Sequence, residues 1–243
     1  PRPPLLALDN VSLSLRAGES MAVIGPAGAG KSTLARIIVG LDTATSGELK
    51  FGETPYRGAD LPQAIRRDIA FVGDNPAQAF NPRHTVGESI AEPLQLELQR
   101  SLDELGSRIV EVVTAVGLHP DILARLPAEF ALPDLQRLAI ARALVTRPRL
   151  IVFDDPLLRL DVLARGEILV LLNRLRADFG LSFILIGHDL DLMRVAADRV
   201  TVLDRGRVVE AGTPARLLED AQQPLSRRLV AAQLPDVGIV PVF

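Results

Sequence analysis

The sequence contains no cysteine, which excludes disulfides, thiolate metal sites and iron–sulfur clusters. It has no apolar run near the roughly 18–20 residues that a membrane-spanning helix needs, and no signal-peptide pattern. The net charge of −3 provides no excess of positive charge for nucleic acid. We therefore interpret the arginine pairs at 66–67 and 227–228 as solvated surface. These absences favour a soluble, intracellular protein that does not bind nucleic acid.

The remaining composition suits a single folded domain. The chain has 243 residues, 48% of them hydrophobic, with a mean hydropathy of +0.24. This length allows one α/β domain with a sizeable core. The first four residues, Pro1-Arg2-Pro3-Pro4, are typical of a linker within a longer polypeptide.

A glycine-rich segment indicates phosphate binding. It follows the apolar run 21–24 and precedes the helical pattern 34–39. This context predicts a buried strand, a turn that exposes backbone N–H groups, and a helix whose positive dipole end faces the same point. The predicted ATP-binding residues are Gly25, Pro26, Ala27, Gly28, Ala29, Gly30, Lys31, Ser32 and Thr33.

Two side chains of this segment have predicted roles. Lys31 would reach the β- and γ-phosphates, and the Ser32 hydroxyl would be a ligand of Mg²⁺. The segment therefore predicts a nucleotide with Mg²⁺, and the family resemblance given below implies that the nucleotide is ATP.

Apolar runs alternate with amphipathic ones along the chain. Strands are expected at 20–24, 48–51, 68–72, 150–153 and 182–186, with a hairpin at 200–203 and 207–210. Helices are expected from the glycine-rich segment to about 40, at 86–98, 102–116, 132–145 and 163–179, and as two short helices at the end. This alternation predicts a mostly parallel sheet with helices on both faces.

Polar residues follow two of these strands, and the glycine-rich segment follows a third. Asp154 and Asp155 follow one strand, and His188 follows another. Ligands of such sheets bind beyond the carboxyl ends of the strands. We therefore expect these residues and the glycine-rich segment to converge on one site.

At this point the chain resembles the nucleotide-binding domain of ATP-binding cassette (ABC) transporters over nearly its whole length. The resemblance implies a P-loop NTPase (RecA-like) α/β fold: a mostly parallel sheet, a small antiparallel β part and a helical subdomain. The matching segments lie at 11–13, 18–19, 45–48, 140–144, 150–156, 160–161, 188–190 and 206–212.

The resemblance implies one ABC-type ATP-binding domain over 1–243. Within it, 1–4 are linker-like, 5–73 and 147–212 form the core, about 74–146 form the helical subdomain, and 213–243 hold the C-terminal helices.

The family's motifs imply roles for single residues. Asp154 would hold Mg²⁺ through water, since Mg²⁺ keeps part of its hydration shell. Asp155 falls at the general base that orients the attacking water. His188 would contact the γ-phosphate, Asp161 falls in the D-loop, and Asp74 falls at the Q-loop position as a further metal ligand.

Two stretches point to one branch of the family. Residues 80–94 and 224–232 resemble oligopeptide, dipeptide and nickel importers. This branch implies a second nucleotide-binding domain, two transmembrane permease subunits and an extracytoplasmic substrate-binding protein as partners. It implies a peripheral location on the cytoplasmic face of the inner membrane, an ATPase activity coupled to transport, and a peptide as substrate.

The family's signature motif is degenerate in this chain. Its Leu-Ser-Gly-Gly-Gln falls on Phe130, Ala131, Leu132, Pro133 and Asp134. Leu132 adds bulk where backbone must approach the phosphate of the partner domain, and Pro133 removes an N–H. Asp134 adds negative charge there. The chain is therefore expected to complete the partner's phosphate site poorly.

Other departures concern the chain's own site. Asp155 is one methylene shorter than the family's glutamate, and catalytic positioning matters at about 1 Å. Asp74 changes the charge at the Q-loop, and Leu158 and Arg159 replace two small residues. The aromatic that stacks on adenine would fall near Arg2, whose guanidinium plane could stack instead.

Two interpretations follow. In the first, the chain is the catalytically impaired half of an asymmetric pair that drives transport with a more active partner. In the second, it is a nucleotide-binding scaffold or regulator without hydrolysis of its own. A P-loop kinase or GTPase of another class is a more distant third, disfavoured by the His188 region and by the closing hairpin at 206–212.

Overall fold

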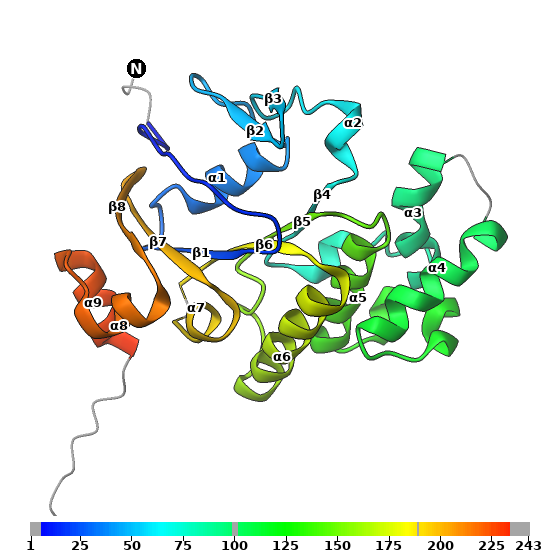
Figure 1. Cartoon of the computed structure of the whole chain (residues 1–243). Coiled ribbons are helices and arrows are strands. Elements are labelled where there is room, and N and C mark those ends of the chain that lie inside the picture. Colours follow the sequence, from blue (N-terminus) through cyan, green and yellow to red (C-terminus); the bar gives the residue numbers. More distant parts are fainter. Residues whose placement is uncertain (1–5, 99–101, 189, 234–243) are drawn as a thin grey trace, which may run out of the picture.

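A six-stranded sheet forms the centre of the computed structural model, which describes residues 6–98, 102–188 and 190–233 (Figure 1). The strand order is β4-β5-β6-β1-β7-β8. All neighbouring pairs are parallel except the β7–β8 hairpin. The mostly parallel sheet is thus confirmed. The strands are β1 Ser20–Ile24, β4 Ile69–Val72, β5 Leu150–Asp154, β6 Ser182–Gly187, β7 Arg199–Asp204 and β8 Arg207–Gly212.

The smaller elements surround this sheet. A separate antiparallel pair consists of β2 Leu49–Phe51 and β3 Thr54–Tyr56. The α-helices are α1 Lys31–Ile38, α2 Gln63–Arg66, α3 Val86–Leu98, α4 Leu102–Ala115, α5 Leu132–Leu144, α6 Val162–Phe179, α7 Leu190–Ala196, α8 Pro214–Asp220 and α9 Pro224–Gln233. Three 3₁₀ turns are η1 Pro76–Ala79, η2 Pro120–Ala124 and η3 Pro127–Glu129. Within the described ranges, no helix combines the length and apolar character required to traverse a bilayer.

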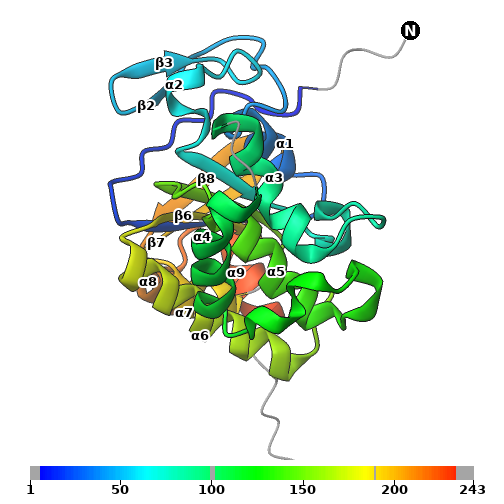
Figure 2. The ribbon, with the colours of Figure 1, turned by 90° about the vertical axis from the view of Figure 1, so that its right-hand side faces the viewer.

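Alternate residues of the central strands face opposite layers. On β5, Ile151 and Phe153 belong to a core cluster with residues of α3, α4, α5 and α6, whereas Val152 belongs to a second cluster with residues of α1. A third cluster joins β1 and β7 to α8 and α9. The two views in Figures 1 and 2 show these layers, with α1 and the β2–β3 pair on one side of the sheet and α6 on the other. The near-continuous apolar character of the strands follows from this burial on both faces.

Local signals set the ends of the longest helix, α6. The Asp161 carboxylate accepts a hydrogen bond of 2.9 Å from the Ala164 N–H at its start. Gly180, with φ +64°, ends it in the left-handed conformation that glycine adopts at little cost.

The structure differs from the expected elements in a few places. The helix after the glycine-rich segment ends at Ile38, not near Gly40, because the chain turns at Gly40 with φ +79° and the Leu41 N–H bonds back to the Arg36 carbonyl. The elements β3, α2 and α7 and the three 3₁₀ turns were not predicted. The remaining predicted elements agree to within about two residues at each end.

The sheet register brings the carboxyl ends of four strands together. Ile24 of β1 pairs with Gly187 of β6, and Ile186 of β6 pairs with Asp154 of β5. Phe153 pairs with Val72 of β4. The segments that follow these strands therefore start from one edge of the sheet.

We predict that Phe153→Ala lowers the free energy of unfolding by about 3–5 kcal/mol, the usual cost of removing a buried phenyl ring. Phe153 is fully buried and packs edge-to-face on Phe183 with ring centroids 5.3 Å apart. Urea unfolding measures the loss. The control is Phe71→Ala on the adjacent strand β4, where the side chain is 36% exposed and the loss should be near 1 kcal/mol or less. Equal losses would contradict this account of the core.

Candidate nucleotide-binding site

The glycine-rich segment forms a tight loop between β1 and α1, held from outside by backbone. A Cβ on Gly25 would lie 2.1 Å from the Leu203 carbonyl oxygen, and a Cβ on Gly30 would lie 2.3 Å from that of Ala7. Both glycines have positive φ, 157° and 100°. Only glycine fits at these points, because any side chain would collide with main-chain atoms.

Lys31 begins α1 and is buried beneath the loop. Its Nζ donates hydrogen bonds of 2.7 Å to the Gly25 carbonyl and 3.0 Å to the Pro26 carbonyl. Burial lowers the pKa of this ammonium, while Asp155 and Asp154 act in the opposite direction. The ammonium thus stabilises the loop. It lies at the start of α1, where the N–H groups of the first turn, including those of Ser32 and Thr33, have no partner within the helix.

Ser32 and Asp154 link the loop to the end of β5. The Ser32 hydroxyl donates a 3.1 Å hydrogen bond to Asp154 Oδ1. Burial raises the pKa of Asp154; this hydrogen bond opposes the shift, and the negative charges of Asp155 and Asp74 add to it. An aspartate whose ionised form is disfavoured by burial and by two other carboxylates would gain from a cation.

Asp155 and His188 form a second pair at the same edge. The two atoms His188 Nδ1 and Asp155 Oδ1 are 3.0 Å apart. The Asp155 N–H donates to the Ile186 carbonyl at 2.8 Å, and its φ of 50° is one that few residues other than glycine adopt. The contact with His188 places the Asp155 carboxylate beside the imidazole.

Asp74 lies two residues beyond β4 and just before η1. Its negative charge adds to the rise in the pKa of Asp154, after burial and the charge of Asp155. It also pairs with a residue that the sequence had marked only as a bulky substitution, Arg159, at 3.9 Å. No local sequence signal could reveal this pair, because its partners are far apart in the chain.

The residues present suit a magnesium ion held mainly by its nucleotide. In the described part of the chain no three acidic or histidine side chains form a metal-binding cluster. Mg²⁺ in nucleotide sites takes one or two protein ligands, the phosphates and water. The Ser32 hydroxyl beside the Asp154 carboxylate provides such a donor set.

The five residues at the signature position lie at the start of α5, away from the pairs above. The Arg125 guanidinium stacks 4.5 Å from the centroid of the Phe130 ring, and Leu132 packs against the core that contains β5. Ala131 caps the helix without a side-chain hydrogen bond, Pro133 is in the first turn, and Asp134 is its acidic residue. The positive end of this helix thus already faces a carboxylate of the chain itself.

Asp161 serves the structure of α6. Its carboxylate caps that helix, as described above. The site therefore brings together the loop, Asp154, Asp155, His188 and, through its charge, Asp74. Its described contacts place neither Asp161 nor residues 130–134 against the loop, and Arg2 lies outside the described residues.

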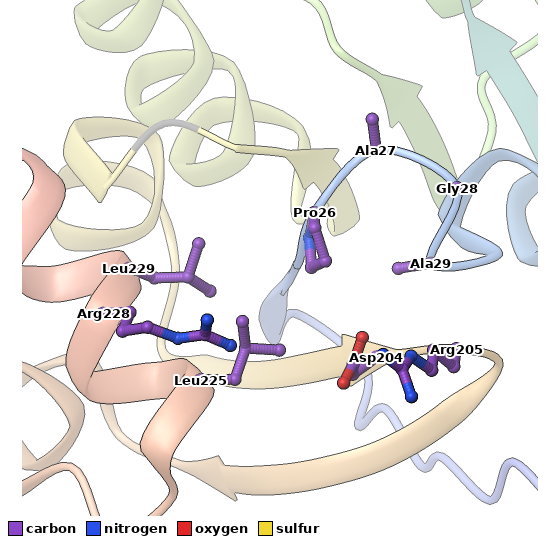
Figure 3. Close-up of a pocket in the computed structure, with 9 residues that line it drawn as sticks. All are labelled: Pro26, Ala27, Gly28, Ala29, Asp204, Arg205, Leu225, Arg228 and Leu229. Carbon is purple, nitrogen blue, oxygen red and sulfur yellow. The ribbon is translucent and has the colours of Figure 1, made fainter.

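A cavity of about 440 Å³ flanks the outer side of the loop (Figure 3). The turn of the β7–β8 hairpin, with Asp204 and Arg205, closes one side, and Leu225, Arg228 and Leu229 of α9 close another. The Gly206 N–H donates to the Ala29 carbonyl at 2.9 Å, which ties the hairpin to the loop. The sequence predicted this hairpin but gave no sign that it supports the loop.

Comparison with known proteins agrees with this geometry. Residues 8–158 match the family described as ABC transporter. The chain is similar to the oligopeptide transport ATP-binding protein OppF of Escherichia coli (39% identity; 97% of this chain, 72% of OppF). It is also similar to the di/tripeptide transport ATP-binding protein DppF of Pseudomonas aeruginosa (37% identity; 93% and 71%).

Two solved structures resemble the fold. One is the dimeric ATP-binding cassette MJ0796 bound to ADP and Pi, with TM-score 0.74 and 31% identity over 86% of this chain and 90% of that one. The other is CbiO1 of Clostridium perfringens, part of the transporter complex CbiONQ, with TM-score 0.78 and 25% identity over 94% and 89%. The match over most of its length, with a glycine-rich loop at the carboxyl edge of a mostly parallel sheet, places the chain in the ABC transporter family, in the branch of the oligopeptide and dipeptide transport ATP-binding proteins.

Proposed function

We propose that the chain is the ATP-binding subunit of a peptide importer. The observation that carries this is the convergence of the phosphate loop with Asp154, Asp155 and His188 at one sheet edge. Similarity to OppF and DppF supports a peptide as the transported substrate.

The same resemblance supports a set of partners. We propose a second nucleotide-binding domain, two transmembrane permease subunits and an extracytoplasmic substrate-binding protein. The chain would then lie peripherally on the cytoplasmic face of the inner membrane. The elements described between Pro76 and Leu144 are all helical, which supports a helical subdomain at about 74–146 between the core parts 5–73 and 147–212.

The residues of the site divide between holding ATP and acting on it. In this proposal, the backbone of 25–33 and Lys31 hold the phosphates, and Ser32, Asp154 and Asp74 face the magnesium ion, which would neutralise phosphate charge. Asp155 would accept a proton from the attacking water, and His188 would orient that water against the terminal phosphate. The 3.0 Å contact of His188 with Asp155 supports a shared role.

Two features support weak turnover. The Asp155 carboxylate is one methylene shorter than a glutamate, so a water placed for the longer side chain lies beyond its ideal reach. At the start of α5, Asp134 supplies negative charge where a partner's phosphate would need positive charge. We therefore propose that the chain is the catalytically impaired half of an asymmetric pair.

A structural or regulatory scaffold is the second candidate. The observation that favours it is the asymmetry between a well-braced loop and an altered set of catalytic positions. In that case ATP would stabilise the chain in the complex, and all hydrolysis would occur at the partner's site.

We predict that Lys31→Ala weakens ATP binding by about 10- to 100-fold, because a hydrogen bond to a charged group contributes roughly 1.5–3 kcal/mol. Isothermal titration calorimetry measures the affinity. The matched control is Lys50→Ala on β2, where the lysine forms a 3.4 Å exposed ion pair with Glu48. An unchanged affinity in Lys31→Ala would sink the phosphate-loop assignment. Thermal unfolding of both variants checks that the loop still folds.

We predict that Asp154→Asn raises the melting temperature of the nucleotide-free protein at pH 7. The raised pKa of Asp154 means that its ionised form is disfavoured in the folded state, so ionisation costs stability above the usual pKa of an aspartate and costs nothing below it. The gain should therefore shrink as the pH falls toward 4. The same variant should lose stabilisation by MgATP.

Differential scanning fluorimetry from pH 7 to pH 4 tests this. The control is Glu53→Gln, which removes an exposed acid in the turn between β2 and β3. A lower melting temperature in Asp154→Asn at pH 7 would show that the carboxylate stabilises the empty site, against this prediction.

We predict that the isolated chain hydrolyses ATP at below about 1 s⁻¹. This lies under the range of roughly 1–100 s⁻¹ that is typical of kinases, which also catalyse phosphoryl transfer. Release of phosphate under saturating MgATP measures it. Turnover within that range would rule out an impaired site. In the assembled transporter, Asp155→Asn should lower turnover if Asp155 is a working base, whereas unchanged turnover assigns hydrolysis to the partner.

A further inference from the structure

Arg159 and Asp74 are brought together from two different strand ends. Arg159 Nη2 lies 3.9 Å from Asp74 Oδ2, and both side chains are about half exposed, 51% and 49%. Asp74 follows β4, and Arg159 lies in the turn between β5 and α6. The pair therefore spans the edge of the sheet at which the nucleotide site lies.

The turn that carries Arg159 is fixed from below. Leu157 and Leu160 on either side are buried, with 3% and 6% exposure. The Leu160 N–H bonds to the Leu157 carbonyl at 3.1 Å, and Arg165 Nε bonds to the Leu160 carbonyl at 3.0 Å. Because Leu157 and Leu160 anchor the turn in the core, Arg159 and the exposed Leu158 between them lie on its outer side.

The charge of the site explains why a cation is useful there. Three carboxylates, those of Asp74, Asp154 and Asp155, interact near the loop, and the first and third both raise the pKa of Asp154. A site with this much negative charge repels the phosphates of ATP. In the described part of the site, the Lys31 ammonium is hydrogen-bonded beneath the loop. The positive charge beside Asp74 is that of Arg159.

We propose that Arg159 is a positioning residue whose guanidinium is the exchangeable counter-ion of Asp74, and that Mg²⁺ competes with it for that carboxylate. This rests on the proposed function, since it concerns the same MgATP site. Without Mg²⁺, Arg159 holds Asp74 and limits its repulsion of phosphate. In the Mg²⁺-bound site, Asp74 would help to hold the ion, which would supply neutralising charge, and the Arg159 guanidinium would no longer be paired with that carboxylate.

The test measures how much Mg²⁺ nucleotide binding needs. The full chain is titrated with a fluorescent N-methylanthraniloyl derivative of ATP at rising Mg²⁺, and the Mg²⁺ concentration that gives half of the gain in affinity is recorded. Arg159→Ala should lower this concentration about two- to fivefold, the range of an exposed ion pair. Arg159→Lys keeps the charge and should stay near the wild-type value.

A double-mutant cycle isolates the pair. In an Asp74→Asn background, Arg159→Ala should leave the Mg²⁺ requirement unchanged, because the competition no longer exists. Lys50→Ala serves as a distant control with the same loss of charge. An unchanged requirement in Arg159→Ala, or an equal shift with and without Asp74, overturns the inference while nucleotide binding and the proposed function stand. Absence of nucleotide binding in the wild type overturns both.

Discussion

The glycine-rich loop lies between two backbone segments that approach it closely, and the proposed site depends on that contact. A side chain at Gly25 would collide with the Leu203 carbonyl oxygen near the end of β7, and a side chain at Gly30 would collide with the Ala7 carbonyl oxygen. The Lys31 ammonium, buried beneath the loop, donates two hydrogen bonds to loop carbonyls. These contacts fix the curvature of the loop, and a preorganised loop lowers the free-energy cost of binding a ligand.

Charged groups of both signs lie around this loop: Lys31, Asp154, Asp155 and, through its charge, Asp74. Asp154 accepts a hydrogen bond from Ser32, and burial and its acidic neighbours raise its pKa. Asp155 contacts His188. Functional sites commonly give up stability in this way. Under the proposed function, this arrangement would take up a metal together with a phosphate chain. The short Asp155 side chain and the carboxylate of Asp134 at the start of α5 are the features on which the proposal of slow hydrolysis rests.

The sequence predicted what local patterns encode. The apolar runs and the turn at Gly25–Lys31 located β1 and α1, and the acidic pair after β5 marked the edge where the site lies. Contacts between distant segments could not be found this way. The pairing of Arg159 with Asp74, and the support of Ala29 by the hairpin at Gly206, arise only when the sheet register brings those segments together. Short elements such as α7 were missed because a few residues carry too little periodicity.

The fate of the bound nucleotide tests most directly whether the chain mainly holds ATP. The assembled pair is incubated with Mg²⁺ and a radiolabelled azido derivative of ATP for many turnovers. Photo-crosslinking then attaches the nucleotide to the chain that holds it. The two chains are separated, and the nucleotide on each is identified. The account predicts triphosphate on this chain and diphosphate on the partner. Diphosphate on this chain, formed as fast as on the partner, would contradict it.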